Sequence, residues 1–363
     1  MTATPAIHAT FQEIQSLHRH LTVLATLPET KDPVLSLFLD LRQPIDALRS
    51  KFTLWSTAAR IATPSAGRAA FDAARAEVEM VFRQEWPESI RSVAVFVRAG
   101  AHPLLLVMPF GATLENHFHA GPVPVIFPLV QLKDRFHRFV VVISTEESSR
   151  IFEITLGAVS EQILATRPAI EQRLGREWTR EHYHQKKREN DRRFLRDQVE
   201  IIGSLMSKRG HNHLILAGHA RHVSALRGSL PKDLEARVSD TVLHAPNGRD
   251  YSAVLEQAID TFIEVEQNES RGTVERLHEQ VCRGGLAVVG AKATREAMEC
   301  GAASELVISE ELPHAEREDL VRLATSLDLA IEVCEGDELL NSHGGVGCLL
   351  RYRMNYASAE AME

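Results

Sequence analysis

The first third of the chain mixes helical and strand patterns of apolar residues. Residues 8–25 carry apolar side chains at helical spacing, which predicts an amphipathic helix. An apolar run at 34–41 lies between two prolines and predicts a buried strand. A second helix is predicted over 69–82, and two apolar runs between 93 and 108 predict a hairpin. We therefore expect residues 1–135 to form one α+β domain.

Strand and helix patterns alternate in the middle of the chain. Apolar runs at 139–143 and 151–156 predict two strands, and from about Lys187 apolar side chains at i, i+4, i+7 and i+11 predict a long helix. A further apolar run, 213–218, ends in glycine and predicts another strand. Such alternation is typical of a parallel or mixed sheet. We assign residues 136–270 to this middle domain.

The last part of the chain begins within a long helical pattern, 252–282. A polar interruption at 268–272 predicts a domain boundary, so that residues 271–363 form the third domain. In that domain, strand and helix patterns alternate, and Gly301 is expected to end a helix in the left-handed conformation. The expected fold class is α/β (mixed α+β) with three domains: an N-terminal α+β domain, a middle α/β domain with a mixed sheet and a long basic helix, and a C-terminal α/β sandwich.

Composition indicates an ordinary globular protein. Hydrophobic residues make up 44% of the 363 residues and charged residues 25%, which suffices for packed cores. There is neither a basic start followed by an apolar run nor an 18-residue apolar segment, so we expect no signal peptide, no membrane span and a cytoplasmic location. The four cysteines form no CxxC pair, which favours reduced thiols over a zinc site.

The strongest local feature is a basic stretch, Arg173 to Arg196, on a chain whose net charge is −8. It mixes cations with the aromatic residues Trp178 and Tyr183, and this combination suits RNA, because cations neutralise phosphates and rings stack on bases. The alternative is a solvated helix face whose cations pair with nearby acids at i,i+4 spacing. Composition leaves both interpretations open. The candidate RNA-binding residues are Arg180, His182, Tyr183, His184, Lys186, Lys187, Arg188, Arg192, Arg193 and Arg196.

Other patterns do not indicate catalysis or a cofactor. His182 and His184 would chelate a metal on a strand but do not share a face of a helix, and no third ligand is evident, so we expect no metal site. The glycine run Gly344 to Gly347 is no P-loop, and a tight turn into a strand is expected there. No nucleophile elbow occurs, and no cofactor is expected.

Several strings resemble the archaeal and eukaryotic class-1 release-factor family, which includes pelota, and in particular the bacterial members of that superfamily. Residues 344–353 are similar to the Gly-Gly-Ile-Gly-x-x-Leu-Arg-Tyr string of the family's C-terminal domain, and 297–310 to its "ALEMGAVETLIV" stretch. Residues 139–157 resemble the paired strands that open the middle domain, and 214–218 its "LVLAG" strand.

The resemblance implies a three-domain ribosomal factor. In the family the N-terminal domain sits in the decoding site, the middle domain reaches the peptidyl-transferase centre, and the C-terminal domain docks a translational GTPase. The chain departs from true release factors where a Gly-Gly-Gln loop should precede the basic helix, because residues 180–185 read Arg-Glu-His-Tyr-His-Gln. A loop that approaches RNA closely needs glycine, so peptidyl-tRNA hydrolysis is not expected. Pelota also lacks this motif and binds the ribosomal A site.

Three functional hypotheses follow. The leading one is a factor that binds the bacterial ribosome at the A site, contacts ribosomal RNA and acts in hibernation or rescue, with elongation factor Tu or another translational GTPase as partner. A second is a peptidyl-tRNA or related ester hydrolase that uses His182 or His184 in place of the glutamine. A third is a non-ribosomal RNA- or protein-binding module. The residues expected to shape the GTPase-facing domain are Gly344, Gly345, Gly347, Arg351 and Tyr352.

Overall fold

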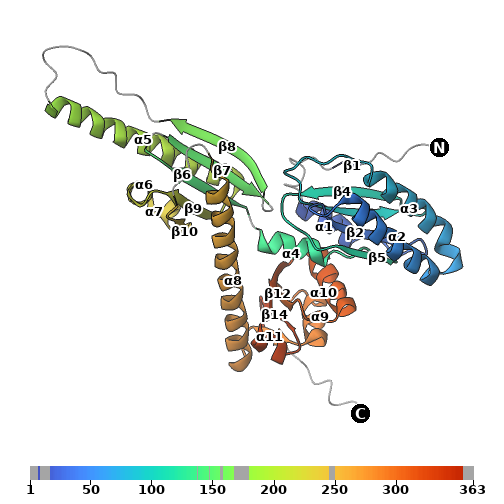
Figure 1. Ribbon diagram of the computed structural model, residues 1–363. Coiled ribbons are helices and arrows are strands. Elements are labelled where there is room, and N and C mark those ends of the chain that lie inside the picture. The colour runs from blue at the N-terminus through green and yellow to red at the C-terminus, as the bar shows by residue number, and fades with distance from the viewer. Residues whose placement is uncertain are drawn as a thin grey trace. The chain divides into compact units, whose positions relative to one another are not determined.

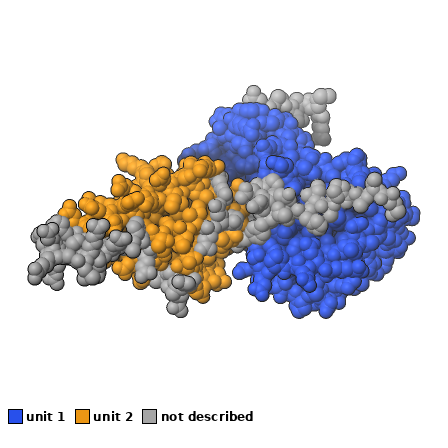
Figure 2. All heavy atoms as spheres, turned by 90° about the horizontal axis from the view of Figure 1, so that it is seen from above, with its two compact units in different colours: residues 1–135, 267–363 blue, residues 136–266 orange. Residues whose placement is uncertain are grey.

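The computed structural model divides the chain into two compact units. One unit combines residues 1–135 with 267–363, and the other contains residues 136–266 (Figures 1 and 2). Together the units contain three β-sheets, and the fold is mixed α/β as expected. The structure describes residues 7–8, 17–136, 138–146, 148–155, 158–166, 180–244 and 250–354.

The first unit begins with a five-stranded sheet in the order β1-β4-β3-β2-β5. Strands β2, β3, β4 and β5 pair antiparallel with their neighbours, whereas the short β1 pairs with β4 in parallel. The predicted strand at 34–41 and the predicted hairpin are confirmed. The strands are β1 (Ile7–His8), β2 (Val34–Asp40), β3 (Ser92–Arg98), β4 (Leu104–Phe110) and β5 (His117–Gly121).

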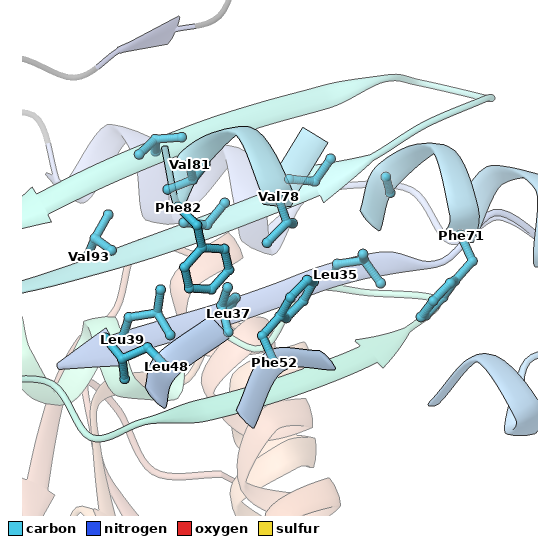
Figure 3. Close-up of a cluster of buried hydrophobic side chains, with 14 residues drawn as sticks. Leu35, Leu37, Leu39, Leu48, Phe52, Phe71, Val78, Val81, Phe82 and Val93 are labelled. Carbon is cyan, nitrogen blue, oxygen red and sulfur yellow. The ribbon is translucent and has the colours of Figure 1, made fainter. Parts of the chain in front are cut away.

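Helices cover this sheet because its inner face is apolar. Figure 3 shows Leu37 of β2 and Phe52 of α2 in the cluster of buried side chains between sheet and helices. The predicted helix at 69–82 is confirmed as α3. The prediction for 8–25 is wrong at its start, since His8 lies in a strand, and residues 9–16 lie outside the described residues. The elements are α1 (Leu17–Ala25), α2 (Ile45–Ala62), the 3₁₀ turn η2 (Ser65–Gly67) and α3 (Arg68–Val81).

The same unit holds a four-stranded sheet in the order β11-β14-β12-β13. Strands β12 and β13 are parallel, and the other pairs are antiparallel. Gly301 ends α9 with φ +71, and the N–H of Ala302 donates to the carbonyl of Ala297, which confirms the predicted left-handed terminator. The elements are β11 (Ala287–Val289), α9 (Ala291–Glu299), β12 (Ala303–Ser309), α10 (His314–Ser326), β13 (Ala330–Cys334), α11 (Glu338–Ser342) and β14 (Val346–Leu350).

A buried carboxylate joins the two parts of this unit. Helix α4 (Phe127–Arg135) begins with the N–H groups of Ile126 and Phe127, which donate to the carboxylate of Glu318 on α10 at 2.9 and 3.1 Å. The guanidinium of Arg317 lies 4.0 Å from the centre of the Phe127 ring. These contacts bring together segments about 190 residues apart in the sequence.

The second unit is a mixed sheet in the order β10-β9-β6-β7-β8, with β6, β9 and β10 parallel. Because side chains alternate along a strand, Val140 and Val142 of β6 face α5, α6 and α7, whereas Phe139, Val141 and Ile143 face α8. The elements are β6 (Phe139–Ser144), β7 (Ser148–Thr155), β8 (Ala158–Thr166), α5 (Arg180–Arg209), β9 (His213–Gly218), α6 (Ala220–Arg227), α7 (Lys232–Glu235), β10 (Val238–Val242) and α8 (Ser252–Cys282).

Helix α8 runs through the polar segment 268–272 without a break. The segment is exposed except for Ser270, and polar side chains that face solvent do not disturb a helix. The division between the two units falls at Glu266 and Gln267, inside this helix. Among the described helices, none is both long and apolar enough to cross a membrane.

Candidate nucleic-acid interface

Helix α5 has two halves with different surroundings. It has 30 residues and is therefore about 45 Å long. In its C-terminal half, Ile202 and Met206 are buried and pack against the sheet, and Phe194, near the middle of the helix, is 3% exposed. Between 185 and 193 the side chains are exposed or half-buried, and Figure 1 shows this end of α5 continuing past the sheet. The buried side chains thus hold the C-terminal half of α5 on the sheet, and the basic residues between 185 and 193 face solvent.

The basic end of α5 carries five exposed cations that form no ion pair among the described residues. Lys186, Lys187, Arg188, Arg192, Arg193 and Arg196 are all exposed. Among the described residues, the last five of these form no ion pair, and an interaction is recorded only for Lys186. Within the described part of the chain, the i,i+4 pairing of an ordinary solvated helix face is thus not formed by Lys187, Arg188, Arg192, Arg193 or Arg196.

The histidine segment lies in the helix and not in a loop. The helix begins at Arg180, seven residues earlier than the predicted start at Lys187, so His182, Tyr183 and His184 occupy its first two turns. Their side chains lie outside the described residues, and so does that of Arg180. Two residues at i and i+2 do not share a helix face, so the backbone keeps His182 and His184 apart as metal ligands.

Two cavities border α5. The larger, about 640 Å³, lies beside Arg192, Leu195, Arg196 and Val199 and reaches Ser229, which precedes α7. It places apolar surface directly beside two of the unpaired cations. The smaller, about 200 Å³, lies on the side of α5 that faces the ends of β6 and the start of α6. The larger cavity is lined mostly by α5, whereas the smaller one is lined by residues from separate elements, which sequence periodicity does not bring together.

Polar groups are buried under the same helix. Gln198 of α5 is 0% exposed, and in the described structure neither atom of its amide has a hydrogen-bond partner. Just after the C-terminal end of α5, the buried ring of His211 meets the buried carboxylate of Glu153. The distance from His211 Nε2 to Glu153 Oε1 is 2.9 Å. Burial lowers the pKa of His211, although the neighbouring Glu153 carboxylate opposes that shift. No sequence motif marks either group.

A cluster of three histidines lies in the other unit. His117 and His119 point to one side of β5, because alternate residues of a strand share a face, and the ring of His314 lies 5.7 and 5.8 Å from theirs. Burial lowers the pKa of His117 and of His119, and the nearby His314 lowers both further. Both shifts favour the neutral rings. His117 and His119 are close together in the sequence, but His314 is far from them, so no local motif unites the three.

The C-terminal glycine run forms a turn into a strand, as predicted. Gly344 and Gly345 have φ values of +85° and +71°, and β14 follows. A Cβ on Gly347 would lie 2.8 Å from the carbonyl oxygen of Val288, so the neighbouring strand requires a glycine there. Arg351 and Tyr352 come directly after β14 and are exposed, and the Tyr352 hydroxyl donates to the carbonyl of Cys300 at 3.0 Å.

Gly218 holds the carboxyl ends of β6 and β9 together. It has φ +122°, and a Cβ there would lie 2.3 Å from the carbonyl oxygen of Ser144. We expect Gly218→Ala to lower the free energy of unfolding by about 2–4 kcal/mol, since it adds backbone strain and a clash with main chain. Differential scanning calorimetry of the full chain measures this.

Gly203 on α5 is the matched control for that substitution. A Cβ there meets only Leu234 Cδ1 at 3.6 Å, an ordinary contact. Gly203→Ala is expected to raise stability by up to about 1 kcal/mol, because alanine is the better helix former. Equal effects of the two substitutions would contradict the close approach at Gly218.

Family models match most of the chain beyond its N-terminal third. The model described as bacterial archaeo-eukaryotic release factor family 10 matches residues 124–262, and the model of eRF1 domain 3 matches residues 267–354. The protein pelota homolog of Pyrococcus furiosus is 24% identical over 185 residues, which are 47% of this chain. The match covers 52% of the pelota homolog, so the chain spans about half the length of this curated relative.

Solved structures of the same group are also similar. A model of ribosome-bound archaeal Pelota and ABCE1 has a TM-score of 0.44 with 15% identity and covers 93% of this chain and 94% of that one. Dom34 of S. cerevisiae, described as a translation termination-like factor that interacts with Hbs1, has a TM-score of 0.43 with 13% identity over 73% of this chain and 82% of that one. With the middle segment matching a bacterial release-factor family and the C-terminal segment matching eRF1 domain 3, the chain is a bacterial member of the superfamily of archaeal and eukaryotic release factors and pelota.

Proposed function

We propose that the protein binds the A site of the bacterial ribosome and acts in ribosome hibernation or rescue, without hydrolysing peptidyl-tRNA. The observation that carries this proposal is the basic end of α5. Its exposed cations Lys187, Arg188, Arg192, Arg193 and Arg196 form no ion pair with any residue that the structure describes. In the superfamily the corresponding helix belongs to the domain that reaches the peptidyl-transferase centre, where the surroundings are RNA.

The electrostatics of α5 support an RNA partner. Between 185 and 196 the helix carries six Lys or Arg against Glu189 and Asp191, although the whole chain has a net charge of −8. Unpaired cations on an exposed helix neutralise phosphates and release counterions, which is the main source of affinity for nucleic acids. Salt screens the repulsion between RNA and the excess acidic residues of the chain beyond about 10 Å.

The missing glycines support binding without hydrolysis. The only Gly-Gly pairs of the chain are 284–285 and 344–345, and both belong to the first unit, far in sequence from α5. Arg180 to His184 form helical turns at the place where the family's glutamine loop would lie. A helical backbone bearing bulky side chains does not approach an RNA backbone as a glycine loop does. A translational GTPase, with elongation factor Tu as the first candidate, is the proposed partner of the domain that carries Arg351 and Tyr352.

Co-sedimentation with 70S ribosomes tests the binding proposal. We expect the purified full-length protein to pellet with ribosomes at low salt and to be displaced as salt rises, and to be enriched on ribosomes from stationary-phase cells. A protein that stays in the supernatant under all these conditions would contradict the proposal. Binding to free RNA without binding to ribosomes would favour the non-ribosomal module.

Release of labelled fMet from programmed ribosomes separates a binding factor from a hydrolase. We expect no release above the background of ribosomes alone, because the sequence lacks the Gly-Gly-Gln motif that positions water in true release factors. Release that His184→Ala abolishes would support the histidine-based hydrolase instead. A release factor with an intact Gly-Gly-Gln loop serves as the positive control for ribosome activity.

A further inference from the structure

A cysteine and two histidines of the first unit form a chain of side-chain contacts. Cys282 is the last residue of α8, and His278 precedes it by one turn, so the two side chains share a helix face. The distance from Cys282 Sγ to His278 Nε2 is 3.4 Å. The other ring nitrogen of His278, Nδ1, lies 3.0 Å from Nε2 of His343, which directly follows α11. The contacts therefore run from a thiol through one imidazole to a second imidazole.

This order of groups is that of an activated nucleophile. A thiol becomes a strong nucleophile when an adjacent base takes its proton, and a third group orients that base. A hydrogen bond between two imidazoles needs one nitrogen as donor and the other as acceptor. With Nδ1 of His278 as the donor to His343, Nε2 keeps the lone pair that accepts a proton from the sulfur of Cys282. His278 is then the base, and His343 acts through it.

The other three cysteines lack this combination of access and a base. Cys300 is exposed and, like Cys282, lies at the C-terminal end of a helix, so the helix dipole acts on both thiols alike. Among the residues that the structure describes, no histidine contacts the Cys300 sulfur. Cys334 and Cys348 are buried, and burial raises the pKa of both thiols, that of Cys348 to about 12.

The charged neighbours of Cys282 on α8 pair with each other. The guanidinium of Arg283 lies 3.5 Å from the carboxylate of Glu279, and both residues are exposed. Their opposite charges offset each other near the thiol. Within the described structure, His278 is thus the basic group that contacts the sulfur.

We propose that Cys282 is a site of reversible modification by low-molecular-weight disulfides, with His278 as its base and His343 as the residue that positions the base. The thiol proton passes to His278 Nε2 while Sγ attacks one sulfur of the disulfide. The S–S bond of the disulfide breaks, and its other sulfur leaves as a thiolate and takes the proton from His278. Cys282 is oxidised to a mixed disulfide, and one half of the disulfide is reduced to a thiol. The proposal does not rest on ribosome binding.

Oxidised glutathione, added to the reduced full-length protein at pH 7, tests this site. Mass spectrometry of peptides follows mixed-disulfide formation at each cysteine in the same sample. We expect Cys282 to react at least about 10-fold faster than Cys300, because a positioned base commonly contributes more than this to a rate. Excess reduced glutathione should restore the free thiol of Cys282. Equal rates at the two exposed cysteines would overturn the proposal.

His278→Gln tests the role of the base, because the amide is polar but takes up no proton. We expect the reaction at Cys282 to slow by about 10-fold and that at Cys300 to stay unchanged. Cys334 and Cys348 report on folding in the same spectra, since their thiols stay unmodified only while the fold buries them. An unchanged rate at Cys282, with both buried cysteines still protected, would overturn the proposal.

Two substitutions of His343 test its positioning role. His343→Ala removes the partner of His278 Nδ1 and should slow the reaction at Cys282 by about 3- to 10-fold, the equivalent of one hydrogen bond. His343→Gln brings an amide near the position of the imidazole Nε2 and should restore most of that rate. Equal slowing in the two variants, or none in either, would overturn the role of His343.

Discussion

Reversing three charges on α5 is expected to weaken ribosome binding by at least about 100-fold. The variant combines Lys187→Glu, Arg192→Glu and Arg193→Glu, all at exposed positions without ion pairs among the described residues. A contact between charged groups contributes about 1.5–3 kcal/mol, and a carboxylate in its place also repels the phosphate. Binding curves from co-sedimentation at several salt concentrations measure the loss.

The salt dependence of that binding identifies its cause. Each phosphate contact contributes about −0.7 to −0.9 to the slope of log affinity against log salt concentration, so loss of three contacts should make the slope shallower by about 2–3. A loss of affinity with an unchanged slope would point to misfolding instead of lost phosphate contacts.

A matched triple reversal shows whether the place of the charges decides the effect. Lys208→Glu, Arg227→Glu and Lys232→Glu alter exposed positions of the same unit and change the net charge by the same amount. Of these, Arg227 also pairs with Glu235 at 4.0 Å, at the surface. We expect this control to bind ribosomes within a few-fold of the unaltered protein. If both triples weaken binding equally, net charge and not the basic end of α5 determines the affinity.

Strong apolar periodicity made much of the fold predictable from the sequence. The strand at 34–41, the hairpin between 93 and 108 and the strand at 213–218 lie where their largely apolar runs predict them. Helix α2 was missed for a physical reason: its buried stripe includes a polar residue, Ser56, whereas the apolar Leu54 and Ile61 are more than 70% exposed. Burial there follows tertiary packing and not the apolar pattern.

The candidate site was predictable only in part. The cations of α5 stand together in the sequence, so composition alone pointed to them, and the structure adds that five of them lack ion pairs among the described residues. The start of α5 was placed too late because residues 180–186 contain no apolar stripe to signal a helix. Gln198 and the cavity beside it depend on the spatial meeting of β6, α5 and α6, which no local pattern encodes.

Replacing Glu318 by alanine is expected to lower the free energy of unfolding by about 2–4 kcal/mol at pH 7. Ile126 and Phe127 are 0% and 4% exposed, and each would keep a buried N–H without its acceptor, at a cost of about 1–3 kcal/mol per group. These N–H groups open α4, where the helix dipole also favours a negative charge. Calorimetry of the full chain measures the loss, and Glu316→Ala, at an exposed position of the same helix, should change stability by less than about 0.5 kcal/mol.

Glu318 should also give the unfolding free energy a characteristic pH dependence. Burial raises the pKa of Glu318 to about 7, although the two N–H donors oppose the shift. The folded chain therefore holds this proton more tightly than the unfolded chain, whose carboxyl titrates near pH 4.5. The raised pKa of Glu318 therefore adds to the unfolding free energy. This stabilisation is complete below pH 4.5 and is lost as pH rises through about 7, a change of about 3 kcal/mol.

Glu318→Gln isolates this titration because the amide does not ionise. The difference in unfolding free energy between the unaltered protein and this variant should fall by about 3 kcal/mol from pH 4.5 to above pH 7. The lowered pKa values of His117, His119 and His314 act in the opposite direction, since their contribution is lost as pH falls below about 6.5, but they are present in both proteins and cancel in the difference. A difference independent of pH would show that the carboxyl stays ionised throughout, and that its two hydrogen bonds outweigh the cost of burying the charge.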